Sequence, residues 1–149
     1  MSDVSFYHLT RQPLERALPK LLERVVGSDL KAVVRVGGEE RLAALDSLFW
    51  TYTPDSFLPH GTAKSGHADM QPVYLTMGDE NPASAQVLML VDGVEADDVA
   101  DFSRCLYMFD GNDDAAVAAA RGYWSRLKQD GHDVTYWRQS DAGRWEKQA

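Results

Sequence analysis

The segment LKAVVRVGGEE, residues 30–40, decides the fold class. Residues 30–36 form a nearly continuous apolar run, which is typical of a strand buried on both faces of a sheet. The glycine pair that follows predicts a turn, and the two glutamates favour the positive N-terminal end of a helix running to about Phe49. A buried strand that leads directly into a helix indicates an α/β protein.

The flanking segments repeat this alternation of strands and helices. Strands are expected at residues 3–9, 30–36, 72–77, 86–91, 106–109 and 132–138, and helices at 13–26, 39–49, 97–103 and 115–129. Pro19 should kink the first helix or delay its start. The polar tail, about 139–149, is expected to be loosely held. The prediction is one domain over residues 1–149, with a mostly parallel or mixed sheet and helices on both faces.

Composition limits the possible partners. The 149 residues include 15 lysines and arginines against 23 aspartates and glutamates, a net charge of −8. So acidic a chain is poorly suited to direct binding of a phosphate backbone, although a local basic patch could hold an acidic peptide. No apolar run is long enough to span a membrane, and the N-terminus does not resemble a signal peptide. The single Cys105 fits a reducing cytoplasm.

Two patterns suggest chemistry, and neither is complete. Gly37-Gly38 lies where dinucleotide-binding folds place a glycine loop, but the full G-x-G-x-x-G pattern is absent. The alternative of a small nucleotide- or metabolite-binding domain with weak enzymatic activity therefore stays open. His60, His67 and Asp69 could hold a metal, yet their spacing matches no compact ligand motif. We expect no catalytic residues, no metal and no cofactor.

The helix at residues 115–129 carries a band that suits a peptide. Its core stripe should be Ala116, Ala120, Tyr123 and Leu127. The band along the border with solvent holds Val117, Arg121, Trp124 and Lys128. Arginine can grip a carboxylate and tryptophan can stack on a ring, so the band suits an acidic peptide with an aromatic residue. The alternative is an ordinary amphipathic helix with solvated cations, as expected for Arg126.

A second candidate surface lies in LDSLFWTYTPDSFLPH, residues 45–60. A helix end carrying Trp50 runs into a loop that contains Phe57, Leu58, Pro59 and His60. Burial of one large apolar side chain contributes roughly 1.5–3 kcal/mol, so either the core or a protein partner should cover these residues.

This stretch resembles the chi subunit family of bacterial DNA polymerase III, in the pattern Leu-Asp-x-x-Leu-[aromatic]-Trp followed by Ser-Phe-Leu-Pro-His. The order of elements from Ser5 to Trp137 is similar to that family. The resemblance implies a nucleotide-binding-like topology without a nucleotide site. It also implies a non-catalytic link between the clamp loader and single-stranded DNA-binding protein, whose acidic, Phe-terminated C-terminal tail the family captures. Contact with DNA would be only indirect.

The resemblance further assigns roles to residues. It implies tail capture by Arg121 with Trp124, and binding of the psi subunit, or of another clamp-loader or helicase-like partner, at Trp50 and Phe57. Two positions depart from the family pattern. Asp110 replaces an apolar residue of the family's pocket, and Ser125 replaces a basic residue that can follow the aromatic one. Lys128 or another basic residue is expected to compensate for Ser125.

Overall fold

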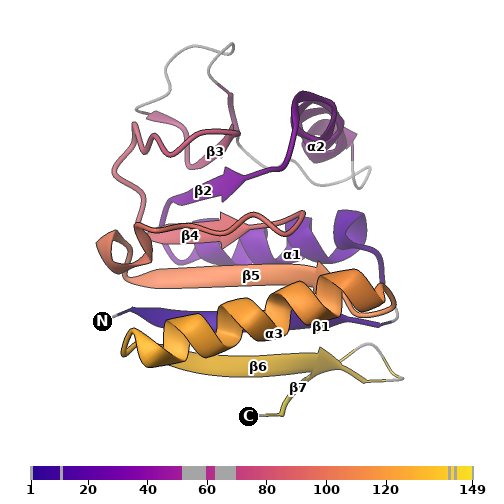
Figure 1. Cartoon of the computed structure of the whole chain (residues 1–149). Helices are drawn as coiled ribbons and strands as arrows, with labels where there is room; N and C mark the ends of the chain where they lie inside the picture. The colour runs from indigo at the N-terminus through magenta and orange to yellow at the C-terminus, as the bar shows by residue number, and fades with distance from the viewer. Residues whose placement is uncertain are drawn as a thin grey trace.

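The described part of the chain contains seven strands, three α-helices and a 3-10 turn (Figure 1). This computed structural model describes residues 2–10, 12–51, 60–62, 70–140, 142 and 144–148, with the backbone alone at 50 and 51. The strands are β1 (Asp3–Leu9), β2 (Ala32–Arg35), β3 (Val73–Thr76), β4 (Val87–Leu90), β5 (Arg104–Asp110), β6 (Asp133–Gln139) and β7 (Trp145–Lys147). The helices are α1 (Leu14–Gly27), α2 (Glu39–Thr51) and α3 (Asp114–Gln129), and the 3-10 turn is η3 (Val99–Asp101).

All seven strands belong to one sheet, in the order β3-β2-β4-β5-β1-β6-β7. Every neighbouring pair is parallel except β6 and β7, which are antiparallel. The expected α/β fold with a mixed, mostly parallel sheet is confirmed. The strand at residues 3–9 is found with the bounds that the sequence predicted.

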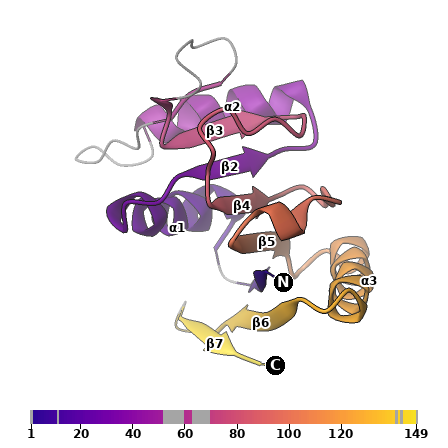
Figure 2. The same ribbon diagram turned by 90° about the vertical axis from the view of Figure 1, so that its left-hand side faces the viewer.

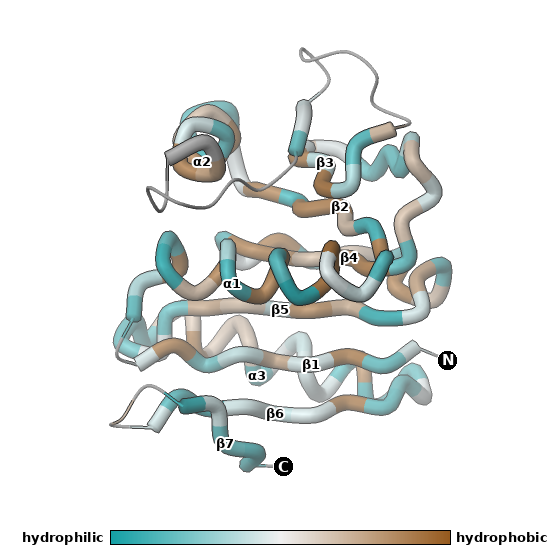
Figure 3. The backbone as a smooth tube through the Cα atoms, turned by 180° about the vertical axis from the view of Figure 1, so that it is seen from behind, coloured by the Kyte–Doolittle hydropathy of each residue, from teal (hydrophilic) through white to brown (hydrophobic). Residues whose placement is uncertain are grey.

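The strand in the segment at residues 30–40 is buried, as its apolar run predicted, and lies between β3 and β4 in the sheet. All four residues of β2 are buried, and Ala32 lies beside Val87 of β4 on one side and Val73 of β3 on the other. Figure 3 shows the hydrophobic colour concentrated in these inner strands and a hydrophilic β7 at the far edge. A strand that is hydrogen-bonded on both sides and covered on both faces carries few polar side chains, because their burial is costly.

The helices cover both faces of the sheet (Figure 2). On one face, α1 and α2 bury Leu18, Leu22, Leu45 and Phe49 against the strands. On the other face, α3 buries Ala120, Tyr123 and Leu127, and η3 adds Val99. The two helix layers therefore make two separate cores, one on each side of the sheet.

An ion pair that the sequence did not reveal lies at the end of β2. Arg35 is only 4% exposed, and its two terminal nitrogens donate to the Asp98 carboxylate at 2.6 and 2.8 Å. One of them also donates to the Asp79 carbonyl at 3.2 Å. The hydrogen bond from Arg35 lowers the pKa of Asp98 and raises that of Arg35. Asp98, expected only to open a short helix, thus neutralises a buried guanidinium.

Helix α1 corrects the expectation for Pro19. The helix begins at Leu14, and the Ala17 amide already donates to the Pro13 carbonyl at 3.2 Å. Pro19 lies inside the helix with its ring buried, so it does not delay the helix start. Proline removes one backbone hydrogen bond from a helix interior. Burial of the ring against the sheet offsets part of that cost.

The C-terminal tail is more ordered than the sequence predicted. Residues 145–147 form β7, which pairs with β6 and places Trp145 opposite Gln139. The Trp145 ring packs on Tyr7 with ring centroids 5.0 Å apart. The expectation of a loosely held tail was wrong for this segment, because one aromatic residue anchors it to the core.

Candidate protein-interaction surface

Helix α3 presents the predicted band at the border between core and solvent. Its first turn is capped by Asp113, whose side chain accepts from the Ala115 and Ala116 amides. The buried stripe consists of Ala120, Tyr123 and Leu127, while Ala116 is half-buried. Beside it, Val117 and Trp124 are half-buried, and Arg121 and Lys128 are exposed.

Trp124 is held edge-on by aromatic neighbours on two strands. Its ring centroid lies 5.5 Å from Phe6 of β1 and 5.7 Å from Tyr136 of β6, both in T-shaped arrangements. The Lys128 ammonium lies 5.5 Å from the centre of the Trp124 ring. Such contacts fix the orientation of the indole without covering it. Its exposed part therefore forms a rigid apolar platform beside a cation.

Residues of β1 and β6 extend this band. His8 of β1 and Tyr136 of β6 are hydrogen-bonded through Nδ1 and the phenol oxygen. Burial lowers the pKa of His8, and the nearby charges of Arg138 and Arg121 lower it further. Burial raises the pKa of Tyr136, while the same two arginines oppose that rise. Arg121 and Arg138 therefore place positive potential around one neutral aromatic pair.

These seven residues form what we call the α3–β6 surface: His8, Val117, Arg121, Trp124, Lys128, Tyr136 and Arg138. The cations of this surface differ from three other arginines of the protein. Arg35, Arg41 and Arg126 each form an ion pair with a carboxylate. Within the described residues, Arg121, Lys128 and Arg138 form none, in a chain where acidic residues outnumber basic ones. Unpaired cations beside an aromatic platform can hold a carboxylate and an aromatic ring together.

Gly111 leaves the space that the His8 ring of this surface occupies. A Cβ at this position would overlap the His8 ring and come within 2.5 Å of the Leu9 carbonyl oxygen. The Gly111 amide donates to that same carbonyl at 2.7 Å. The turn after β5 therefore passes so close to β1 that a side chain here would displace His8.

Three further positions named by the sequence analysis lie on β5 and α3. Asp110, which departs from the family pattern, is exposed and accepts from the Asn112 amide at 2.9 Å. Ser125 is exposed. Arg126 corrects the expectation of a merely solvated cation, since it pairs with Glu95 at 2.9 Å and lies over the Tyr123 ring.

Only part of the second candidate surface can be placed. Trp50 lies near the end of α2, its side chain is not described, and Phe57, Leu58 and Pro59 lie outside the described residues. The His60 side chain is fully buried, 2.8 Å from the Asp46 carboxylate and edge-on to Phe49. His60 therefore supports the end of α2 from inside the fold.

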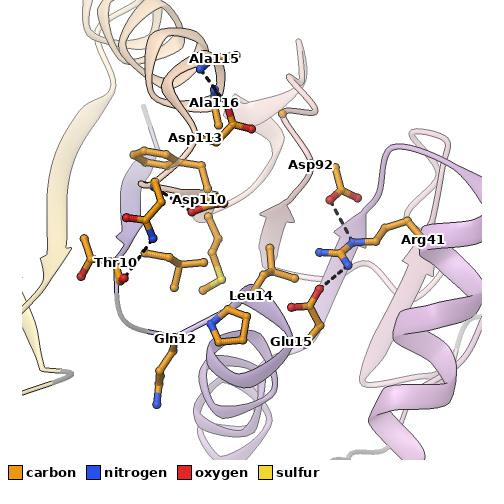
Figure 4. Close-up of a pocket in the computed structure, with 16 residues that line it drawn as sticks. Thr10, Gln12, Leu14, Glu15, Arg41, Asp92, Asp110, Asp113, Ala115 and Ala116 are labelled. Atoms are coloured by element: carbon orange, nitrogen blue, oxygen red, sulfur yellow. Dashed lines mark hydrogen bonds and ion pairs between the residues drawn. The ribbon is translucent and has the colours of Figure 1, made fainter.

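The carboxyl ends of the parallel strands enclose a cavity of about 750 Å³. The cavity lies between the ends of β1 and β5. The chain continues from β1 into α1 on one face of the sheet and from β5 into α3 on the other face (Figure 2). Such a point in an α/β sheet is where these folds bind ligands. Figure 4 shows Arg41 between Glu15 and Asp92, at 2.7 and 3.1 Å. Asp110 and Asp113 add further carboxylates to the lining. The negative charge of these carboxylates disfavours the binding of a phosphate in this cavity.

The structure shows the surroundings of the residues that the sequence analysis considered for nucleotide binding, catalysis or metal binding. The Gly37 amide donates to Asp92 Oδ2 at 3.3 Å, so a carboxylate faces the turn where a nucleotide would place its phosphate. Burial raises the pKa of the Cys105 thiol to about 12. Of the three residues that could have held a metal, His67 and Asp69 lie outside the described residues. Among residues that are described, no three His, Cys, Asp or Glu side chains gather around a common point.

The structure defines a single α/β domain with cations beside aromatic residues on its α3–β6 surface. Comparison with known proteins gives the family. Residues 1–135 match the model of the DNA polymerase III chi subunit, HolC, so the chain belongs to this family.

A probable DNA polymerase III subunit chi from Rickettsia prowazekii (strain Madrid E) is 30% identical over 91 residues. That alignment covers 61% of this chain and 55% of the relative, so the match spans about half of the relative's length.

No helix in the described part of the chain is long and apolar enough to cross a membrane.

Proposed function

We propose that this protein is a non-catalytic accessory subunit of the bacterial DNA polymerase III holoenzyme, working in the cytoplasm. In this role it captures the acidic C-terminal tail of single-stranded DNA-binding protein on the α3–β6 surface. The observation that carries the proposal is the group of unpaired cations around the Trp124 platform. Membership of the chi family supports the same role.

The chemistry of capture follows from the placement of charge. Arg121 and Arg138 both act on the His8–Tyr136 pair, so a carboxylate placed there meets two guanidinium groups. Charge-assisted hydrogen bonds to guanidinium are among the stronger polar contacts. An aromatic side chain next to that carboxylate would stack on Trp124, with Val117 beside it. Lys128 supplies charge for further acidic residues and occupies the helical turn after Ser125.

The second surface would join the protein to the clamp loader. Trp50 follows directly after Phe49, whose ring is fully buried, so α2 is anchored up to the residue before Trp50. We place the psi subunit, or another clamp-loader or helicase-like partner, at Trp50, Phe57, Leu58 and Pro59, next in sequence to His60, which is bonded to Asp46. Contact with DNA would then run through the tail-bearing partner.

The tail proposal is tested by fluorescence anisotropy with a labelled acidic peptide that ends in Asp-Phe-Pro-Phe. Arg121→Ala should weaken binding at least tenfold, because a hydrogen bond to a charged group contributes about 1.5–3 kcal/mol. Arg126→Ala is the matched control on the same helix, since Arg126 is occupied by Glu95, and it should change affinity less than about twofold. Equal effects of the two variants, or no binding by the wild type, would overturn the proposal.

A further inference from the structure

A second basic and aromatic groove lies on the opposite face of the sheet. It has a volume of about 480 Å³ and runs between α1 and the β6–β7 pair. Figure 2 shows β7 beyond the edge of α1, at the margin of the sheet. We call it the α1–β7 groove. Trp137 and Trp145 supply its aromatic side, and Lys20, Arg24 and Arg144 supply its charge.

The strand register sets both tryptophans on the α1 side of the sheet. Trp137 pairs with Tyr7, which packs into the core beneath α1, and Trp145 packs on the same Tyr7 ring. Both indoles are half-buried. In the described structure neither indole N–H has a hydrogen-bond partner, so each is free to donate to an acidic ligand. Ala17 and Leu21 of α1 supply apolar surface between them.

The cations of the groove are also unpaired. Lys20, Arg24 and Arg144 are exposed, and none forms an ion pair with another described residue. No carboxylate lines the groove among the residues that the structure places there. Lys20 and Arg24 stand four residues apart on α1 and so project from the same helix face. In a protein of net charge −8, three cations that face no carboxylate among the described residues are complementary to an anionic ligand.

We propose that the α1–β7 groove binds an acidic peptide segment that carries an apolar or aromatic side chain. The carboxylates would meet Lys20, Arg24 and Arg144, and the apolar side chain would lie between the indoles. A peptide fits better than a nucleic acid, because single-strand binding domains cover about 4–16 nucleotides with a continuous basic path. This groove offers three cations in about 480 Å³, within the size range of a pocket for a few side chains. The site is separate from the α3–β6 surface, which faces the other side of the sheet.

The test uses a labelled, amidated peptide of alternating glutamate and phenylalanine, followed by anisotropy. Saturable binding by the wild type is expected, with Lys20→Glu and Arg24→Glu each weakening it about tenfold. Arg126→Glu is the control for the change of net charge, because Arg126 is exposed on α3, which packs on the opposite face of the sheet. It should change affinity less than twofold. The peptide with glutamine in place of glutamate should not bind.

Three other outcomes would overturn the inference. Absence of saturable binding would exclude an acidic peptide ligand of this kind. Binding that is abolished by Arg121→Ala and unaffected by Arg24→Glu would assign the peptide to the α3–β6 surface alone. Tighter binding of a twelve-residue oligothymidine, with the same dependence on Arg24, would identify the groove as a nucleic-acid site. The tail proposal rests on Arg121 and can fail or hold independently of these results.

Discussion

Removal of the Asp98 carboxylate should destabilise the fold strongly. Asp98→Ala leaves the Arg35 guanidinium, 4% exposed, without its two short hydrogen bonds. Breaking a buried ion pair from one side costs about 3–5 kcal/mol. The Asp98 side chain is 31% exposed, so water can partly replace it, and we expect about 3 kcal/mol. For a chain of this length that loss lowers the melting temperature by about 6–12 °C.

The measurement is urea unfolding followed by circular dichroism, with Asp97→Ala as the matched control. Asp97 is the neighbouring carboxylate, is exposed, and should change the free energy of unfolding by less than about 0.5 kcal/mol. The double variant Arg35→Met with Asp98→Ala should recover most of the loss, because it removes the stranded charge. A loss below about 1 kcal/mol for Asp98→Ala, or no recovery in the double variant, would refute the reasoning.

The same pair predicts a pH dependence. Arg35 holds the pKa of Asp98 below its usual value, so the folded state favours the ionised carboxylate. Its contribution to stability is therefore complete above the pKa of an unfolded aspartate, about 3.9, and is lost as the pH falls through the lower folded pKa. The difference in unfolding free energy between wild type and Asp98→Ala should shrink from pH 5 towards pH 2. A constant difference over that range would contradict the assigned charge state.

Three further predictions concern the surfaces. Gly111→Ala should cost about 1–3 kcal/mol and weaken tail binding, since its methyl group displaces His8; unfolding and anisotropy measure both effects. Trp145→Ala should cost about 2 kcal/mol and speed amide exchange in β6, because it removes the contact with Tyr7. Unchanged exchange would mean that β7 does not depend on this contact. Tail affinity should fall steeply from 0.05 to about 0.5 M salt as exposed charges are screened, and a salt-independent affinity would argue for apolar contacts alone.

Local sequence patterns were sufficient for most of the strands and helices. The apolar run at 30–36 predicted a strand buried on both faces, and the spacing on α3 predicted the buried positions of Ala120, Tyr123 and Leu127. Both predictions rest on periodicity, which follows from the fixed geometry of helices and strands. The short tail strand β7 was missed because its three residues carry no such pattern, and its position depends on Tyr7, far away in sequence.

The candidate site could also be predicted only in part, within one helix but not between strands. The wheel of α3 was enough to group Arg121, Trp124 and Lys128, since all three lie on one helix. His8 and Tyr136 join them across 128 residues of sequence, through a register between β1 and β6 that no local pattern encodes. Before that register is known, a histidine and a tyrosine at alternating strand positions look like ordinary residues at the border of the core. The Arg35–Asp98 pair was missed for the same reason.

The central claim is tested most directly by the indole N–H signals of the four tryptophans in a two-dimensional NMR titration. The ¹⁵N-labelled wild-type protein is titrated with an unlabelled tail peptide ending in Asp-Phe-Pro-Phe, and each signal is assigned by a Trp→Phe variant. The account predicts that the Trp124 signal shifts with saturation and that Arg121→Ala abolishes this shift, whether or not the signals of Trp137 and Trp145 also move. A stationary Trp124 signal, with or without movement of the other indoles, would contradict tail capture on the α3–β6 surface.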